Sequence, residues 1–237
     1  MDTTVKLQKF VSECGLMSRR KAEEEIQAGH FQVDGVTATL GMRVHPVNST
    51  VTYKGKLIEK VERKLYYKLF KPRGYVSTLS DEKGRKCIAD LLKELPDRVY
   101  PVGRLDLDSE GLILLTNDGE LANKMMHPSG ECEKVYVVRL RSEPTPEQLR
   151  QLNSSMEIDG YTIRPCRVTP MHGFDKCTYR FVLREGRNRQ IRKMCEQTGL
   201  EVARLTRILI GKVALGELRP GEFAKLDKKE LDYLKSL

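Results

Sequence analysis

One segment of the sequence, residues 103–111, brings carboxylates, an arginine and glycines close together. Asp106 follows a Gly-Arg-Leu triplet, and Asp108 and Glu110 stand at the next alternate positions. A loop carboxylate that a neighbouring arginine keeps ionised can act as a nucleophile or as a general base. The same acidic spacing suits a calcium loop, although its twelfth position would be Asn117 instead of glutamate. A solvated acidic turn is the third interpretation.

The densest basic segment spans residues 184–193 and leads into a helical pattern. Asn188 is a suitable N-cap for this helix, and Gly199 is a suitable stop. Like charges on one side of a helix cost about 0.2–0.5 kcal/mol per pair. They are expected here at Arg189, Arg192 and Lys193. A nearby anion would remove that cost, and a phosphate and a catalytic carboxylate both qualify. A solvated basic face is the alternative.

The chain has 237 residues, with 42 Lys and Arg against 33 Asp and Glu, which gives a net charge of +9. Residues 1–60 carry 9 basic and 7 acidic residues, so residues 61–237 carry 42 − 9 = 33 and 33 − 7 = 26. This excess favours nucleic acid as the partner. The longest aliphatic run, residues 112–115, falls far short of the roughly 20 residues that span a bilayer. We therefore expect no membrane contact.

The six cysteines include no Cys-x-x-Cys pair, and the four histidines are scattered along the chain. Paired cysteines or clustered histidines are the usual sequence sign of a structural or catalytic zinc site. The sequence thus predicts no metal site and free thiols in a reducing compartment. We expect a cytoplasmic protein, and a monomer.

The first 60 residues have the pattern of two helices followed by hairpins. Four apolar residues share one face of the first helix, at Leu7, Phe10, Val11 and Cys14. Ser18 is a natural N-cap for the second helix, which reaches about Ala28. Asp34-Gly35, flanked by apolar residues, predicts a tight hairpin turn. Residues 61–64 are short and charged, as a linker would be.

The second helix opens with three cations, where the helix dipole disfavours positive charge. These residues are Arg19, Arg20 and Lys21. Pairs with the glutamates at 23–25 would contribute about 0.2–0.5 kcal/mol each, in the weaker order of cation before anion. Contact with RNA or DNA phosphates explains this order better, and a solvated face is the alternative.

The larger part of the chain alternates strand-like segments with short helical patterns. Strands are expected at 66–70, 112–116, 135–140, 178–183 and 200–210. Helices are expected at 88–92, 121–125, 146–152 and 191–198. This order favours an α+β domain with a largely antiparallel sheet.

Four motifs together resemble one known family. Gly103-Arg104-Leu105-Asp106, with Ser109 and residues 111–119, resembles the first signature of RsuA-like ribosomal RNA pseudouridine synthases. Its other motifs are matched, in the family's order, by Lys71-Pro72-Arg73-Gly74, Lys134-Val135-Tyr136 and the segment from Glu185 to Arg192. Residues 5–50 are similar to the alpha-L RNA-binding domain of ribosomal protein S-four. The resemblance covers nearly the whole chain.

The resemblance implies two domains and a set of site residues. Residues 1–60 would form the small helical and hairpin RNA-binding domain, and residues 65–237 a largely antiparallel mixed-sheet pseudouridine synthase domain. By resemblance, Asp106 is the catalytic aspartate, Tyr136 packs against the target base, and Arg192 pairs with the aspartate. Two apolar residues would line the pocket, namely Leu205 and Ile208. Members of the family use neither cofactor nor metal.

The charge pattern and the resemblance predict an enzyme that converts a uridine of ribosomal RNA, in the large subunit, to pseudouridine. The RNA-binding residues would be Arg19, Arg20, Lys21, Lys71, Arg73, Arg104, Arg187, Arg189 and Lys193. Both steps of the chemistry, cleavage of an N-glycosidic bond and recapture of the base, need a closed pocket that excludes water. The alternative is a non-catalytic RNA-binding factor in ribosome assembly. Such a factor would not require Asp106, Tyr136 and Arg192 together.

Overall fold

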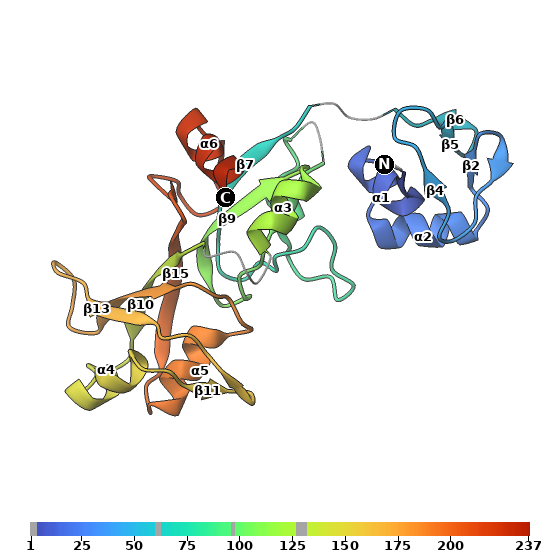
Figure 1. The fold of residues 1–237 in the computed structure, drawn as a ribbon. Helices are drawn as coiled ribbons and strands as arrows, with labels where there is room; N and C mark the ends of the chain where they lie inside the picture. Colours follow the sequence, from blue (N-terminus) through green and yellow to red (C-terminus); the bar gives the residue numbers. More distant parts are fainter. Residues whose placement is uncertain (1–3, 60–62, 96–97, 127–131) are drawn as a thin grey trace. The chain divides into compact units, whose positions relative to one another are not determined.

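The computed structural model describes residues 4–59, 63–95, 98–126 and 132–237 (Figure 1). The chain divides into two compact units. One comprises residues 1–65 with two short additions, 95–99 and 117–119. The other comprises the rest of the chain from residue 66 onward. The predicted linker, residues 61–64, lies partly outside the described residues. No helix in the described ranges is long and apolar enough to cross a membrane.

The smaller unit packs two helices on short strands. Its elements are β1 (Val5–Lys6), α1 (Leu7–Glu13), α2 (Arg19–Gln27), β2 (Phe31–Val33), β3 (Val36–Thr37), β4 (Arg43–Val44), β5 (Val51–Tyr53) and β6 (Lys56–Leu57). The apolar face predicted for the first helix is confirmed, because Leu7, Phe10 and Val11 are buried in the core of this unit. Asp34 and Gly35 have positive φ angles of 51° and 82°, as the predicted hairpin turn requires.

The larger unit is built on one sheet of nine strands. The strand order is β13-β14-β10-β15-β9-β7-β17, with β16 beside β15 and β8 beside β9. The strands are β7 (Tyr66–Lys71), β8 (Tyr100–Val102), β9 (Glu110–Thr116), β10 (Lys134–Leu140), β13 (Arg167–Pro170), β14 (Thr178–Leu183), β15 (Val202–Ile210), β16 (Val213–Ala214) and β17 (Phe223–Lys225). Among the described strands of this sheet, β15 and β9 pair in parallel and the other pairs are antiparallel, which confirms the predicted largely antiparallel mixed sheet.

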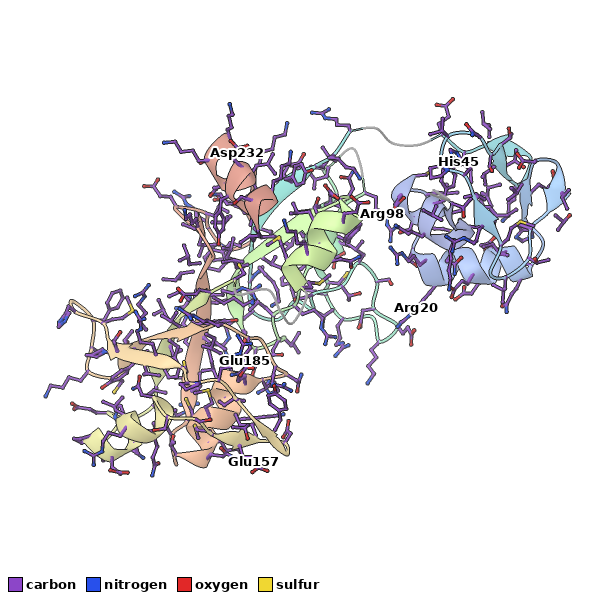
Figure 2. The ribbon with its side chains drawn as sticks, in the orientation of Figure 1. Arg20, His45, Arg98, Glu157, Glu185 and Asp232 are labelled. Carbon is purple, nitrogen blue, oxygen red and sulfur yellow. The ribbon has the colours of Figure 1, made fainter. Side chains whose placement is uncertain are left out.

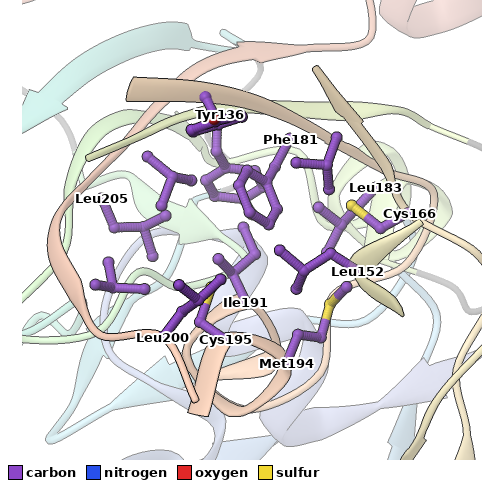
Figure 3. Close-up of a cluster of buried hydrophobic side chains, with 14 of the residues drawn as sticks. Tyr136, Leu152, Cys166, Phe181, Leu183, Ile191, Met194, Cys195, Leu200 and Leu205 are labelled. Carbon is purple, nitrogen blue, oxygen red and sulfur yellow. The ribbon is translucent and has the colours of Figure 1, made fainter. Parts of the chain in front are cut away.

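Helices cover this sheet at its two ends. They are η1 (Ile88–Leu91), α3 (Gly119–Met126), α4 (Pro146–Leu152), α5 (Gln190–Gln197) and α6 (Lys228–Ser236), and a small hairpin of β11 (Glu157–Ile158) and β12 (Tyr161–Thr162) lies beside α5 (Figure 1). One apolar core joins α4 and α5 to β10 and β14, and Figure 3 shows it around Phe181 and Ile191. A second core joins α3 and α6 to β7 and β9.

The parallel junction between β9 and β15 depends on Gly111. Its φ is +105°, and a Cβ placed there would stand 2.3 Å from the backbone oxygen of Arg207. Only glycine permits this close approach of two backbones. The junction lies where the two cores meet, since Leu105 belongs to the first core while Val102 and Leu112 belong to the second.

Candidate active site

The segment that connects β8 to β9, residues 103–109, is held in place at its carbonyl groups. Ser77 Oγ donates to the oxygen of Leu105 at 2.7 Å, and the amide of Gly74 donates to that of Leu107 at 2.8 Å. Arg192 Nη2 reaches the oxygen of Asp108 at 3.0 Å, and Lys71 Nζ reaches that of Ser109 at 2.8 Å. These bonds fix the backbone on both sides of Asp106. We call this segment the aspartate loop.

The prediction that Lys71 contacts RNA is corrected by the structure. Its side chain is fully buried, with Nζ bonded to the carbonyl oxygens of Pro72 and Ser109. Burial lowers the pKa of Lys71 to about 8, although the carboxylates of Asp106 and Asp108 oppose this shift. Lys71 ends β7 in phase with the buried Leu69, so its side chain faces the interior.

Arg192 forms its ion pair with Asp108, whereas we expected Asp106. Its Nε lies 3.2 Å from Asp108 Oδ2, and its side chain is only 14% exposed. Asp106 instead faces Arg189, whose Nη1 lies 3.8 Å from Asp106 Oδ2. Arg189 also makes two hydrogen bonds of 3.0 Å to the carboxylate of Asp108. The anion predicted for the basic helix is thus present, and it is a pair of carboxylates on the aspartate loop.

Arg189 occupies a strained backbone position. Its φ is +51° and its ψ is 29°, in the left-handed region that non-glycine residues rarely adopt. The N-cap of α5 is therefore Arg189, and the predicted N-cap, Asn188, is wrong by one residue. Such strain persists where surrounding contacts over-determine the conformation, and here they are the bonds of Arg189 to Asp108.

The two arginines and Asp108 set one another's ionisation. Partial burial favours the neutral form of Asp108, but the hydrogen bonds from Arg189 and the charges of both arginines outweigh it. The pKa of Asp108 therefore lies below its ordinary value. Hydrogen bonding to Asp108 raises the pKa of Arg189, while burial lowers the pKa of Arg192. Asp108 is the carboxylate that connects α5 to the aspartate loop.

The calcium interpretation does not fit these contacts. Asp106 and Asp108 both contact Arg189, and Glu110 accepts hydrogen bonds from Arg204 Nε at 2.6 Å and from Thr206 Oγ1 at 2.9 Å. All three acidic groups are already neutralised by arginine, which disfavours a bound cation. Within the described ranges, no three His, Cys, Asp or Glu residues are placed to hold a metal ion.

Asp106 and Tyr136 line the same cleft, whose volume is about 1270 Å³. Tyr136 lies on β10 and is 8% exposed, in the apolar core that Figure 3 shows together with Phe181 and Leu205. The apolar part of the cleft wall includes Leu105, Leu183, Ile191, Leu205 and Ile210. The aspartate loop, β10 and β15 thus bring a carboxylate, an aromatic ring and aliphatic side chains together.

The prediction that Ile208 lines the pocket is wrong, whereas Leu205 does line it. In the pairing of β15 with β10, Tyr136 lies opposite Arg207 and Val135 lies opposite Leu209. Ile208 is the extra residue of this bulge and packs against the second core.

The bulge leaves Arg207 at the wall of the cleft, a residue that we had not singled out. Its Nε donates to the oxygen of Leu112 at 2.7 Å, but its buried Nη2 has no partner in the described protein. A buried donor without a partner is rare in proteins, and binding of a substrate group would satisfy it. The sequence signal for Arg207 is its position two residues after Leu205, because residues two apart in a strand face the same side.

The remaining cations of this unit differ in their surroundings. Arg73 and Arg104 are exposed. Arg187 lies over the ring of Tyr161, with 3.1 Å between the guanidinium carbon and the ring centroid. Lys193 forms an ion pair with Asp159, in the turn between β11 and β12. Lys193 is therefore paired within the protein, while Arg73 and Arg104 are exposed to solvent.

In the smaller unit, two of the three predicted cations are free. The side chains of Arg19 and Arg20 are exposed, and no carboxylate in the described residues pairs with them (Figure 2 labels Arg20). Lys21 lies 3.0 Å from Glu24 and 3.3 Å from Glu25. Ser18 caps α2 as predicted, since its Oγ accepts a hydrogen bond from the amide of Lys21.

Known proteins resemble this chain along almost all of its length. Residues 66–197 match the RNA pseudouridylate synthase family, and residues 5–50 match the S4 domain. The chain is 39% identical to ribosomal large subunit pseudouridine synthase B of Bacillus subtilis, covering 98% of this chain and 96% of that protein. It is also 39% identical to the dual-specificity RNA pseudouridine synthase RluF of Escherichia coli, covering 97% and 78%.

A solved structure agrees with these matches. The crystal structure of a pseudouridylate synthase superposes with a TM-score of 0.71 at 26% identity, and the match covers 97% of this chain and 99% of that one. These likenesses support the catalytic interpretation over a non-catalytic RNA-binding factor. Together with the geometry of the aspartate loop, they show that this chain belongs to the RNA pseudouridine synthase family and carries an N-terminal S4 domain.

Proposed function

We propose that this protein isomerises a specific uridine of large-subunit ribosomal RNA to pseudouridine. The observation that carries the proposal is the aspartate loop, which presents Asp106 in the cleft that Tyr136 also lines. The likeness to a large-subunit synthase of Bacillus subtilis supports the choice of RNA.

In the proposed reaction the N1–C1′ bond breaks, the uracil turns, and a C5–C1′ bond forms. N1 gains a proton and C5 loses one, so no atom is added or lost. Asp106 serves the ribose side, and both attack at C1′ and removal of a C2′ proton require its ionised oxygen at the same place. Lys71 and Arg192 fix the backbone that follows Asp106, through their hydrogen bonds to the carbonyl oxygens of Ser109 and Asp108.

In this proposal the side chains of the cleft wall bind the uracil base of the target uridine. Tyr136 offers an aromatic face for stacking, and Leu205 helps to exclude water while the uracil is detached. The unpaired Nη2 of Arg207 is a donor for a uracil carbonyl oxygen. A stacked uridine must first leave its stack, at a cost of a few kcal/mol. Arg73, Arg104 and the S4 domain would supply this energy by binding the RNA backbone.

The test is to map pseudouridines in ribosomal RNA. Unmodified large- and small-subunit transcripts are incubated with the purified protein, and the result is compared with RNA from cells with and without the gene. We expect one new pseudouridine site in the large-subunit transcript and its absence from the deletion strain. Sites in the small-subunit RNA alone would refute the choice of subunit, and no pseudouridine in either RNA would refute the proposed function.

A further inference from the structure

Of the tyrosine and phenylalanine side chains in the part of the chain that the structure describes, two are exposed, Tyr161 at 46% and Phe174 at 60%. Tyr161 lines the cleft that contains Asp106, whereas Phe174 lies between β13 and β14 and is not part of that cleft. An exposed aromatic ring at the wall of a nucleic-acid cleft is the feature on which unpaired bases stack.

The ring of Tyr161 is already held from one side. The guanidinium carbon of Arg187 lies 3.1 Å from the ring centroid, which is a cation–π contact. Because Arg187 covers one face, the exposed surface of Tyr161 must come largely from the other face and the ring edge. Arg187 itself is kept in place by Glu185, whose Oε2 lies 3.7 Å from its Nε.

The hairpin that carries Tyr161 is fastened to the same helix as the aspartate loop. Gln197 of α5 donates to the oxygen of Glu157 at 2.8 Å, and Lys193 of α5 forms an ion pair with Asp159. Figure 2 labels Glu157 and Glu185 in this region. Since α5 also holds Asp108 through Arg192, the ring and Asp106 are positioned by one rigid element.

An arginine close to Tyr161 in the sequence lines the same cleft. Arg164 is exposed and lines the cleft, and its guanidinium has no carboxylate partner in the described residues. Its amide nitrogen donates to Glu185 Oε1 at 3.0 Å, which fixes its position relative to Arg187. Glu185 is the neighbouring carboxylate, and it is occupied by Arg164, Arg187 and Gln190.

We propose that Tyr161, backed by Arg187, is a stacking site for an unpaired RNA base next to the target uridine, with Arg164 on its phosphate. The proposal rests on the proposed function, because it takes RNA as the occupant of the cleft. It adds a second base-binding site outside the pocket of Tyr136. This site binds an unpaired base next to the target uridine and does not bind the uracil that reacts.

The experiment measures the affinity of the full chain for the large- and small-subunit transcripts in an Asp106→Asn background, so that turnover does not interfere. Tyr161→Leu should weaken binding about five- to one-hundred-fold, because a leucine keeps the apolar bulk and loses the aromatic face. The slope of affinity against salt should not change, since no phosphate contact is lost. Tyr161→Phe should bind as the parent does, and so should Phe174→Leu, the matched control at the other exposed aromatic.

A cycle of changes in the RNA identifies the base. In a stem-loop fragment that the wild type modifies, an abasic residue beside the target should weaken binding to the parent but not to Tyr161→Leu. Unchanged affinity of Tyr161→Leu would overturn the proposal, as would equal losses in Tyr161→Phe or Phe174→Leu. Failure of the proposed function itself would appear separately, as absence of pseudouridine with the wild type.

Discussion

Helices α2 and α5 both carry arginines and lysines at or near their N-terminal ends, and the two helices use these cations differently. In α2, Arg19 and Arg20 are exposed and have no carboxylate partner in the described residues. In α5, Arg189 and Arg192 both reach Asp108, which lies more than 80 positions earlier in the chain. A cluster of cations in a sequence therefore does not define its role. The role depends on whether the fold brings a carboxylate to the cluster, and we infer RNA binding for α2 and positioning of the aspartate loop for α5.

The strongest test of the role of α5 is to remove the carboxylate that it positions. Asp106→Asn should lower the single-turnover rate at least about 10³-fold, because an amide can neither attack C1′ nor accept the C2′ proton. RNA affinity should stay within a few-fold of wild type, since the cations of α2 are unchanged. A variant that still forms pseudouridine at a comparable rate would contradict the inference that α5 positions a catalytic carboxylate.

The next largest effect is expected at Arg192. Arg192→Ala should lower the rate at saturating RNA about 10²-fold, because the oxygen of Asp108 loses its donor and the aspartate loop shifts. Arg192→Lys should recover only part of the rate, since a lysine cannot contact Asp108 and Val202 together. The measurement is the single-turnover rate beside the dissociation constant. If RNA affinity fell while the single-turnover rate did not change, Arg192 would act in RNA binding, as we infer for the arginines of α2.

A smaller effect is expected from α2. Arg19→Ala with Arg20→Ala should weaken RNA binding about ten-fold at physiological salt and leave the rate at saturating RNA unchanged. Lys21→Ala is the matched control, because Glu24 and Glu25 already engage this side chain and its removal should matter less. An equal loss of RNA affinity in Lys21→Ala would mean that the ion pairs of Lys21 with Glu24 and Glu25 do not keep this lysine from binding RNA.

The smallest expected effect is on the pKa of Lys71, which lies buried against the aspartate loop. The Cε resonance of Lys71 should titrate in an NMR experiment with a pKa near 8, below the 10.5 of an ordinary lysine. Asp106→Asn should lower that pKa further, because the carboxylate of Asp106 favours the charged lysine. The unfolded chain binds more protons between these two pKa values, so the contribution of Lys71 to the free energy of unfolding should rise with pH across this window. A pKa near 10.5 would contradict the buried position.

Local patterns in the sequence predicted the longer strands and most helices, but not α6 or the shorter strands β8, β13, β16 and β17. The spacing of Leu7, Phe10 and Val11 defined one helix face, and Asp34-Gly35 defined a turn, because both depend on neighbours in the chain. Tyr136 and Leu205 were assigned to the pocket by the family resemblance and not by a local pattern, and both line the cleft.

The errors concern contacts between distant segments and the direction of side chains in strands. The partner of Arg192 depends on a loop more than 80 residues away, so no local pattern could choose between Asp106 and Asp108. Lys71 was readable as buried, because it is in phase with Leu69 in a strand. Ile208 stands three residues after Leu205, and an odd spacing puts two side chains on opposite faces of a regular strand. Ile208 is also the extra residue of the bulge beside Arg207, and its side chain does not line the cleft.

The salt dependence of RNA affinity tests the division of roles between α2 and α5 most directly. It is measured on one RNA for the wild type, for Arg19→Ala with Arg20→Ala, and for Arg192→Ala. Each lost phosphate contact reduces the slope of log affinity against log salt by about 0.7–0.9. We predict a slope that is shallower by about 1.4–1.8 for the α2 variant and unchanged for Arg192→Ala. An unchanged slope for the α2 variant, or a shallower one for Arg192→Ala, would contradict the account.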